Sequence, residues 1–257
     1  MDLGITGRTA VVCASTSGLG EAIARALAAE GAHVVVSGRR GDRARQIAGE
    51  LPSAVGVEVD LTDPAGSERL LAAARQAFGE VDILLLNGPG PKAGPAAQVT
   101  EPDVDAAIDA LLRPQLRLVS AVLPGMRERR WGRILAVGSS GISAPLPNLA
   151  LSNLGRAALA GYLKTLAAEV AADGVTVNLL LPGRIATDRA EALDQGRAER
   201  SARSIDDVQE ESRAEIPAGR YGEPAEFGSV GAFLCSEQAS YVTGTAVRCD
   251  GGLVRSL

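Results

Sequence analysis

Aromatic residues are scarce in this chain, since only 3% of its 257 residues are Phe, Trp or Tyr, whereas 46% are hydrophobic. A densely packed core must therefore be built from Val, Leu, Ile and Ala. Such a composition is typical of parallel sheets, whose strands are buried on both faces. The length suits one large domain of this kind.

Cysteine and histidine are also rare. Cys13, Cys235 and Cys249 are too few and too scattered for a disulfide framework or a zinc site, and we expect no metal centre. The one histidine, His33, stands at the start of an expected strand, where a packing or surface role is the simpler interpretation.

The chain has neither a basic excess nor a long apolar run. Its formal net charge of −5 makes a nucleic-acid partner unexpected. Residues 1–7 lack the charged and apolar pattern of a signal peptide, and no apolar stretch reaches the length of a membrane span. We therefore expect a cytoplasmic protein that does not associate with membranes.

Apolar β-branched runs alternate with amphipathic stretches rich in Ala and Leu, a pattern typical of βαβ units. We expect strands at 9–14, 33–37, 54–59, 83–87, 133–137, 176–181 and 246–249. We expect helices at 18–30, 42–51, 64–78, 101–121 (continuing toward Met126), 151–172 and 224–234. Right-handed crossovers would join these units into a parallel sheet with helices on both faces. The sequence thus predicts a single doubly wound α/β domain over 1–257.

One stretch interrupts this alternation. Residues 188–218 are rich in Arg, Glu, Asp and Ala and have few large apolar side chains. A solvated helical insertion is one interpretation. We favour a helical lid over a substrate site, because long excursions in compact domains are usually functional or disordered. The stretch also follows a strand directly, at the sheet edge where ligands bind in such folds.

The segment 13–20, Cys-Ala-Ser-Thr-Ser-Gly-Leu-Gly, follows an expected strand and begins an expected helix. This context is typical of a Rossmann-type dinucleotide-binding loop. Gly18 allows the backbone to approach a pyrophosphate, and Gly20 allows the helix to pack close to the sheet. The helix N-terminus presents free N–H groups to the phosphates. The expected cofactor contacts in this loop are Ser15, Thr16, Ser17, Gly18, Leu19 and Gly20.

The end of the second strand bears on the choice of cofactor. Folds specific for NAD place a carboxylate there to hold the ribose hydroxyls, but here Gly38 is followed by Arg39 and Arg40. An arginine can bind a 2′-phosphate with paired N–H donors. NADP(H) is therefore favoured, and NAD(H) is the alternative.

These features resemble the short-chain dehydrogenase/reductase family, which writes the phosphate loop as TGxxxGxG. Cys13 and Ala14 stand where that family has Thr and the first Gly, and alanine resists the positive φ that glycine adopts there. The resemblance covers nearly the whole chain. It continues through 87–90 (the family's NNAG), 182–187 (its PGxIxT) and the C-terminal pattern from 220 to 252.

The resemblance also implies cofactor contacts beyond the phosphate loop. Asp60 matches the family's adenine-contacting Asp, and Ile185 and Thr187 match residues that approach the nicotinamide amide. The further contacts implied in this way are Asp60, Leu61, Asn87, Gly88, Arg156, Pro182, Gly183, Ile185 and Thr187.

The family's catalytic set is Asn, Ser, and the Tyr and Lys of YxxxK, and this chain keeps only the Ser. By alignment Ser139 is that serine, Ser152 replaces the Tyr, Arg156 replaces the Lys and Leu111 replaces the Asn. A serine hydroxyl is a much weaker acid than a phenol, and arginine stays charged at ordinary pH. The usual tyrosinate mechanism is therefore absent.

Two cations near the expected site are candidates for other roles. Lys92, in the Gly/Pro-rich loop after the fourth strand, could attract an anionic substrate or donate a proton if burial lowered its pKa. An exposed loop lysine is an equally good interpretation. Arg184, just after the Pro-Gly pair, is a second candidate anion contact.

The combination resembles a divergent subgroup of β-ketoacyl-acyl-carrier-protein-reductase-like proteins. It implies an NADP(H)-dependent oxidoreductase of carbonyls or alcohols, with Ser139, Ser152, Arg156 and Lys92 as catalytic candidates. The substrate would be a small molecule, anionic or bound to an acyl carrier. The alternatives are a non-redox enzyme (dehydratase, isomerase or cyclase) and a cofactor-binding pseudoenzyme. The resemblance also implies a homodimer or homotetramer formed through helices 101–121 and 151–172.

Overall fold

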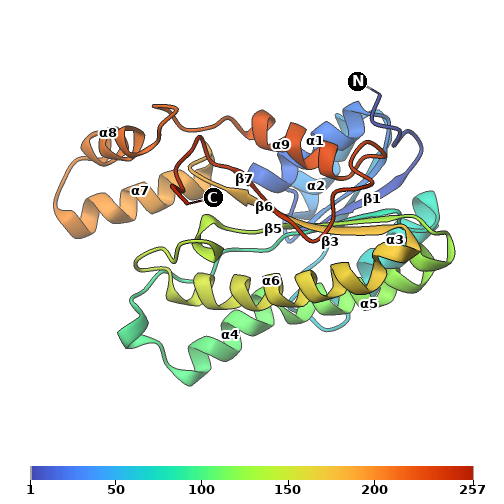
Figure 1. Cartoon of the computed structure of the whole chain (residues 1–257), viewed down its shortest axis with the longest axis horizontal. Helices are drawn as coiled ribbons and strands as arrows, with labels where there is room; N and C mark the ends of the chain where they lie inside the picture. Colours follow the sequence, from blue (N-terminus) through green and yellow to red (C-terminus); the bar gives the residue numbers. More distant parts are fainter. Residues whose placement is uncertain (1, 257) are drawn as a thin grey trace.

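The seven expected strands form one parallel sheet in the computed structural model, which describes residues 2–256 (Figure 1). Each strand lies within two residues of its predicted bounds. The strands are β1 (Thr9–Val12), β2 (His33–Gly38), β3 (Ala54–Glu58), β4 (Ile83–Leu86), β5 (Gly132–Val137), β6 (Val175–Pro182) and β7 (Ala246–Cys249). Their order is β3-β2-β1-β4-β5-β6-β7. The sequence therefore predicted the fold class correctly.

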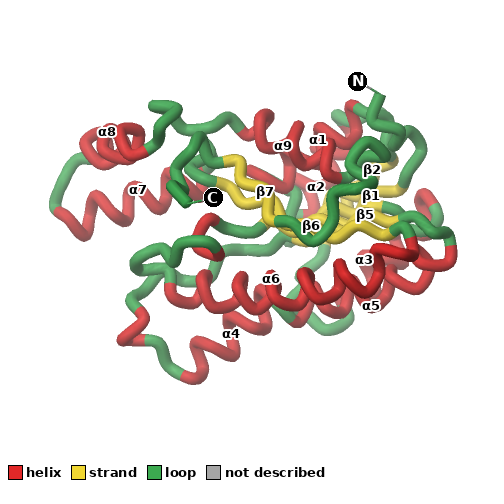
Figure 2. The backbone as a smooth tube through the Cα atoms, in the orientation of Figure 1, coloured by secondary structure: helices red, strands yellow, loops and turns green. Residues whose placement is uncertain are grey.

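Helices cover both faces of the sheet (Figures 1 and 2). One face carries α1 (Gly18–Ala29), α2 (Gly41–Gly49) and α9 (Pro224–Leu234). The other carries α3 (Gly66–Phe78), α5 (Arg113–Glu128) and α6 (Ala150–Val170). On this side α4 (Glu101–Leu111) packs against α5 and α6. The core on each face consists mainly of Val, Leu, Ile and Ala, as the low aromatic content requires. No helix among residues 2–256 combines the length and apolar character needed to cross a bilayer.

The single helix expected from 101 to 126 is instead two helices, α4 and α5, which meet at Leu112. Pro114 explains the break. Its nitrogen has no hydrogen to donate to the carbonyl of Ala110, and its ring disfavours helical geometry at the residue before it. The proline then occupies the first turn of α5, where its missing donor costs nothing.

The unusual stretch after β6 folds into α7 (Asp188–Ser201) and α8 (Ile205–Glu215), which extend beyond the sheet (Figure 1). Asp194 of α7 is fully buried although its side chain is acidic. It accepts hydrogen bonds from Arg184 Nη1 at 2.7 Å and from the Tyr221 hydroxyl at 2.8 Å. Arg184, one of the candidate anion contacts, is therefore engaged in holding α7 to the loop after β6.

His33 packs as expected. Its ring stacks on Phe78, with 4.9 Å between ring centroids and an interplanar angle of 7°. Its Nδ1 lies 2.6 Å from Ser53 Oγ.

The turn from β1 into α1 contains an unusual backbone conformation. Ala14 has a φ of 47°, in the left-handed region where the family has glycine. A side chain there costs about 1–2 kcal/mol, because Cβ approaches the following carbonyl oxygen. The geometry expected of a glycine is thus retained at this position with an alanine.

We predict that Ala14→Gly raises the free energy of unfolding by about 0.5–1 kcal/mol. The relief of the left-handed strain exceeds the roughly 0.5–1 kcal/mol that glycine loses through its freer unfolded chain. Urea denaturation followed by circular dichroism measures the change. Ala72→Gly, on the exposed face of α3, is the matched control and should lower stability by about 1 kcal/mol. Equal losses in the two variants would contradict a strained Ala14.

Candidate active site

A cavity of about 1010 Å³ opens along the carboxyl edge of the sheet. The loops that follow β1 to β6 contribute to its wall, together with residues of α6 and α7. Strand order reverses between β1 and β4, so the loops that follow these two strands diverge and leave a crevice. The cavity thus occupies the place where ligands bind in doubly wound sheets.

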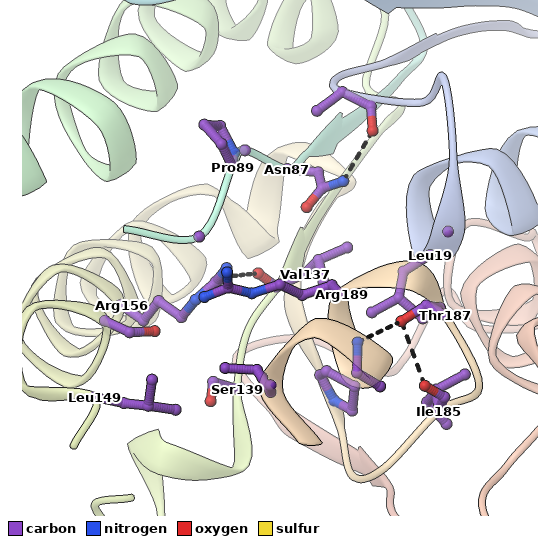
Figure 3. A pocket seen from close by; sticks show the side chains of 18 of the residues that line it. Leu19, Asn87, Pro89, Val137, Ser139, Leu149, Arg156, Ile185, Thr187 and Arg189 are labelled. Carbon is purple, nitrogen blue, oxygen red and sulfur yellow. Dashed lines mark hydrogen bonds between the residues drawn. The ribbon is translucent and has the colours of Figure 1, made fainter. Parts of the chain in front are cut away.

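Most of the residues predicted from the sequence lie together in the wall of this cavity. They are Thr16, Ser17, Gly18, Leu19, Arg39, Arg40, Asp60, Leu61, Asn87, Gly88, Ser139, Ser152, Arg156, Pro182, Gly183, Ile185 and Thr187. Figure 3 shows several of these side chains converging from opposite sides.

Ser15, Gly20 and Lys92 do not line the cavity. Ser15 is fully buried, and its Oγ donates to the Val12 carbonyl at 2.7 Å, so it joins strand ends rather than facing a ligand. Gly20 is needed for close packing, as predicted. Lys92 is exposed on its loop, so the structure does not bring it to the site and supports the surface interpretation.

The two diverging strand ends are held together at the centre of the crevice. Asn87 Nδ2 donates to the Ala14 carbonyl at 3.2 Å (Figure 3). A Cβ at Gly20 would lie 2.5 Å from that carbonyl and 2.9 Å from Asn87 Nδ2, so only glycine fits there. The glycine of the phosphate loop and the asparagine after β4 therefore form one packed unit.

Gln115 of α5 also lines the cavity, and sequence reasoning missed it. It is buried, and its Nε2 donates to the Asn87 carbonyl at 3.3 Å. A signal was present, because Gln115 shares the apolar helix face of Leu118, Val119 and Val122. A lone amide on such a face needs a polar partner, which the strand end supplies.

The adenosine end of the cavity is rich in positive charge. A Cβ at Gly38 would lie 2.8 Å from Thr16 Cγ2, so the acidic side chain typical of NAD-specific folds would require Thr16 to move. Arg40 Nη2 donates to the Thr16 carbonyl at 2.9 Å and to Ser17 Oγ at 2.8 Å. Arg40, which the sequence predicted as a cofactor contact, thereby brings a positive charge directly to the phosphate loop. Arg39 is exposed beside it.

Asp60 faces the same end of the cavity from the loop after β3. The Thr62 backbone N–H and hydroxyl donate to Asp60 Oδ1 at 2.9 and 2.8 Å, and these bonds, with the nearby charge of Arg39, lower the Asp60 pKa. The group is therefore a carboxylate at neutral pH, able to accept a hydrogen bond from an amino group.

The opposite end holds the residues aligned with the family's catalytic set. Ser139 Oγ accepts a hydrogen bond from the Gly141 N–H at 3.1 Å, which leaves its own proton free for a ligand. Ser152 Oγ forms no hydrogen bond with residues 2–256. Both hydroxyls can therefore donate to an oxygen that enters the cavity.

Arg156 crosses toward the end of β5. Its Nη1 donates to the carbonyl oxygens of Val137 at 2.7 Å and Gly138 at 3.2 Å. Burial, reinforced by the positive charge of Arg189, lowers the Arg156 pKa to about 10. The guanidinium still carries its proton at neutral pH, so Arg156 acts as a fixed charge rather than as an acid.

No Tyr, His, Lys or Cys is among the residues of the 2–256 range that line the cavity. Tyr221 lies close to α7, but its hydroxyl donates to buried Asp194. The cavity thus offers hydroxyl donors and fixed positive charge, without a side chain that exchanges a proton readily near neutral pH.

Comparisons with known proteins agree with this architecture. A family model described as enoyl-(acyl carrier protein) reductase matches residues 13–254. The 3-oxoacyl-[acyl-carrier-protein] reductase of Salmonella typhimurium is 35% identical over 250 residues, which cover 96% of this chain and 97% of the relative. Dehydrogenase/reductase SDR family member 4 of Bos taurus is 38% identical over 258 residues, 98% of this chain and 89% of the relative.

A similar solved structure is the L-sorbose reductase of Gluconobacter frateurii, complexed with NADPH and L-sorbose. It is 32% identical, has a TM-score of 0.93, and the match covers 100% of both chains. The chain therefore belongs to the short-chain dehydrogenase/reductase family, as its motifs predicted.

Proposed function

We propose that this protein is an NADP(H)-dependent oxidoreductase that reduces a carbonyl group or oxidises the corresponding alcohol, as a 3-oxoacyl reductase does. The observation that carries the proposal is one continuous cavity with arginines at its adenosine end and free hydroxyl donors at the other. The NADPH complex of the L-sorbose reductase supports it, as does the similarity to the Salmonella 3-oxoacyl reductase.

The residues present fit the dinucleotide. Gly18 adopts a φ of +58° at the start of α1, and its place is open enough for a phosphate to approach the backbone. Arg39 and Arg40 would hold a 2′-phosphate, and Asp60 would accept from the adenine amino group. When bound, the nicotinamide ring donates or accepts a hydride.

The chain's own residues would polarise the substrate. Ser139 Oγ donates to the carbonyl oxygen, and Ser152 Oγ supplies a second donor, so both stabilise the negative charge that gathers on that oxygen. The charge of Arg156 adds to this effect. After the carbon receives the hydride, the oxygen takes a proton from solvent, because the lining residues of the 2–256 range include no suitable acid.

We also infer that α7 and α8 form the substrate lid. Ala190, Leu193 and Arg197 of α7 and Glu215 of α8 line the cavity on the side away from the adenosine end. The buried Asp194 contacts anchor this wall to the loop after β6.

Replacing Arg39 tests the choice of cofactor. Arg39→Ala should raise the NADPH dissociation constant about 10- to 100-fold, the size of a lost charge-assisted interaction, and leave NADH binding almost unchanged. Fluorescence titration measures both constants. Arg45→Ala is the control, since Arg45 is exposed on α2, pairs with Asp42 at 2.7 Å and lies outside the cavity lining. Equal weakening of NADPH and NADH in Arg39→Ala would argue against a 2′-phosphate contact.

Replacing Ser139 tests the reaction. Ser139→Ala should lower kcat for carbonyl reduction by about 10²–10³-fold, because a donor to the developing oxyanion is lost. NADPH oxidation with 3-oxo esters and other ketones provides the assay. Ser143→Ala, an exposed neighbour outside the cavity lining, should keep full activity. Tight NADPH binding with no turnover of any ketone would instead favour a non-redox enzyme or a pseudoenzyme.

We further infer that the chain forms a homodimer or homotetramer through α6. Leu154, Ala157, Ala158 and Gly161 are exposed and lie on one face of this helix at helical spacing. Small side chains there allow a second helix to approach closely.

Light scattering after size exclusion should therefore give two or four times 26.3 kDa. Ala158→Arg should shift the mass toward the monomer, whereas Ala72→Arg on exposed α3 should not. A monomeric native protein would contradict this assembly.

A further inference from the structure

Two arginine side chains point toward one another inside the cavity (Figure 3). Arg156 extends from α6, and Arg189 extends from the first turn of α7 on the opposite wall. Two cations facing each other repel, so this arrangement costs free energy unless something negative lies between them.

Neither guanidinium is neutralised by a carboxylate within residues 2–256. Two other arginines on the same side of the cavity, which come from α7 and from the loop that precedes it, are neutralised. Arg184 pairs with Asp194 at 2.7 Å, and Arg197 pairs with Glu211 at 2.9 Å. Arg156 and Arg189 lack such a partner within residues 2–256, and they differ from the unpaired arginines at the adenosine end in facing each other across the cavity.

The Arg156 guanidinium is held in place while part of it remains free. Its Nη1 donates to the carbonyl oxygens of Val137 and Gly138, whereas its Nε and Nη2 form no hydrogen bond within residues 2–256. Burial and the charge of Arg189 depress the Arg156 pKa, and a bound anion would offset both effects.

Arg189 approaches from the other side. Its Nη2 lies 3.4 Å from the Pro91 carbonyl, so the side chain spans from α7 to the loop after β4. Arg189 is the second residue of α7, and the positive dipole end of this helix is offset in part by the carboxylate of Asp188, the first residue, which also lines the cavity. The positive charges of two guanidinium groups thus converge on one place.

This place adjoins the proposed reaction centre, because the carbonyls that hold Arg156 belong to the two residues before Ser139. A substrate whose anionic group lies between the arginines could therefore place a nearby carbonyl group where it accepts a hydrogen bond from Ser139. Each guanidinium is planar and presents paired N–H donors, an arrangement that fits the two oxygens of a carboxylate.

We propose that Arg156 and Arg189 bind the carboxylate of the substrate, and that the substrates are short oxo-carboxylates or the matching hydroxy-carboxylates. This inference rests on the proposed carbonyl chemistry. Arg156 and Arg189 take the place of the two anion contacts expected from the sequence. Lys92 lies outside the cavity lining, and Arg184 is paired with Asp194.

Matched probes test the proposed carboxylate site on the NADPH-loaded protein. The reducible probes are 3-oxobutanoate, its neutral amide and its N-acetylcysteamine thioester, and the unreactive pair is butanoate and butanamide. The acid should have a kcat/KM at least ten times that of the amide or thioester. Butanoate should bind in calorimetry, whereas butanamide should not.

Arg189→Gln should lower kcat/KM for the acid about 10- to 100-fold through KM, the loss expected for one charge-assisted contact, and leave the values for the amide and for NADPH binding unchanged. Arg189 is exposed, so its replacement leaves the core intact. Arg213→Gln is the control, because Arg213 pairs with Glu210 at 2.9 Å and lies outside the cavity lining.

Three outcomes separate the ideas. Efficient reduction of the thioester that does not depend on Arg189 would overturn the carboxylate site and uphold the proposed reductase. Weaker NADPH binding in Arg189→Gln would assign Arg189 to the cofactor phosphates and also overturn it. Arg189-dependent binding of butanoate without reduction of any probe would uphold the anion site and overturn the reductase.

Discussion

The hydrogen bond from Asn87 to the Ala14 carbonyl fixes the geometry on which the whole cavity depends. The strand order reverses between β1 and β4, so the loops that follow these paired strands leave the sheet in different directions, and this bond joins them across the crevice. The carbonyl is presented for this bond because Ala14 takes a left-handed conformation, and α1 can approach because Gly20 has no side chain. The positions of the phosphate loop and of the loop after β4 therefore follow from one small group of contacts.

Local pattern was enough to predict the sheet, because strands buried on both faces produce continuous apolar runs that are hard to mistake. Helix limits depended on finer chemistry. The apolar period runs unbroken through Leu112, and only Pro114 marks the break between α4 and α5. The helices after β6 have few apolar residues. A buried acid, Asp194, attaches α7 to the domain, and its partners Arg184 and Tyr221 lie in loops on either side of the two helices.

The order of the motifs along the chain likewise predicted most of the residues that line the cavity, since each motif follows a strand and all the strands end at one edge. Side-chain direction could not be predicted in the same way. Lys92 is close to the site in sequence but faces solvent, and Ser15 turns into the sheet. Arg40 was predicted as a cofactor contact, but its bond to Ser17 was not. Arg189 was missed, because its position depends on how far a long side chain reaches across the crevice.

Arginine at position 156 changes what the site can do. A lysine with its pKa lowered by burial could release a proton, whereas the Arg156 guanidinium keeps its charge even with a pKa of about 10. The high pKa of a guanidinium excludes a proton relay through Arg156, and burial makes the retained charge effective, because solvent screens it less. With Ser152 in place of a phenol, the site lacks a side chain suited to acid–base chemistry and offers the fixed charge of Arg156 instead. Under the proposed chemistry, such a site would discriminate between substrates by their charge and would leave the supply of the proton to solvent.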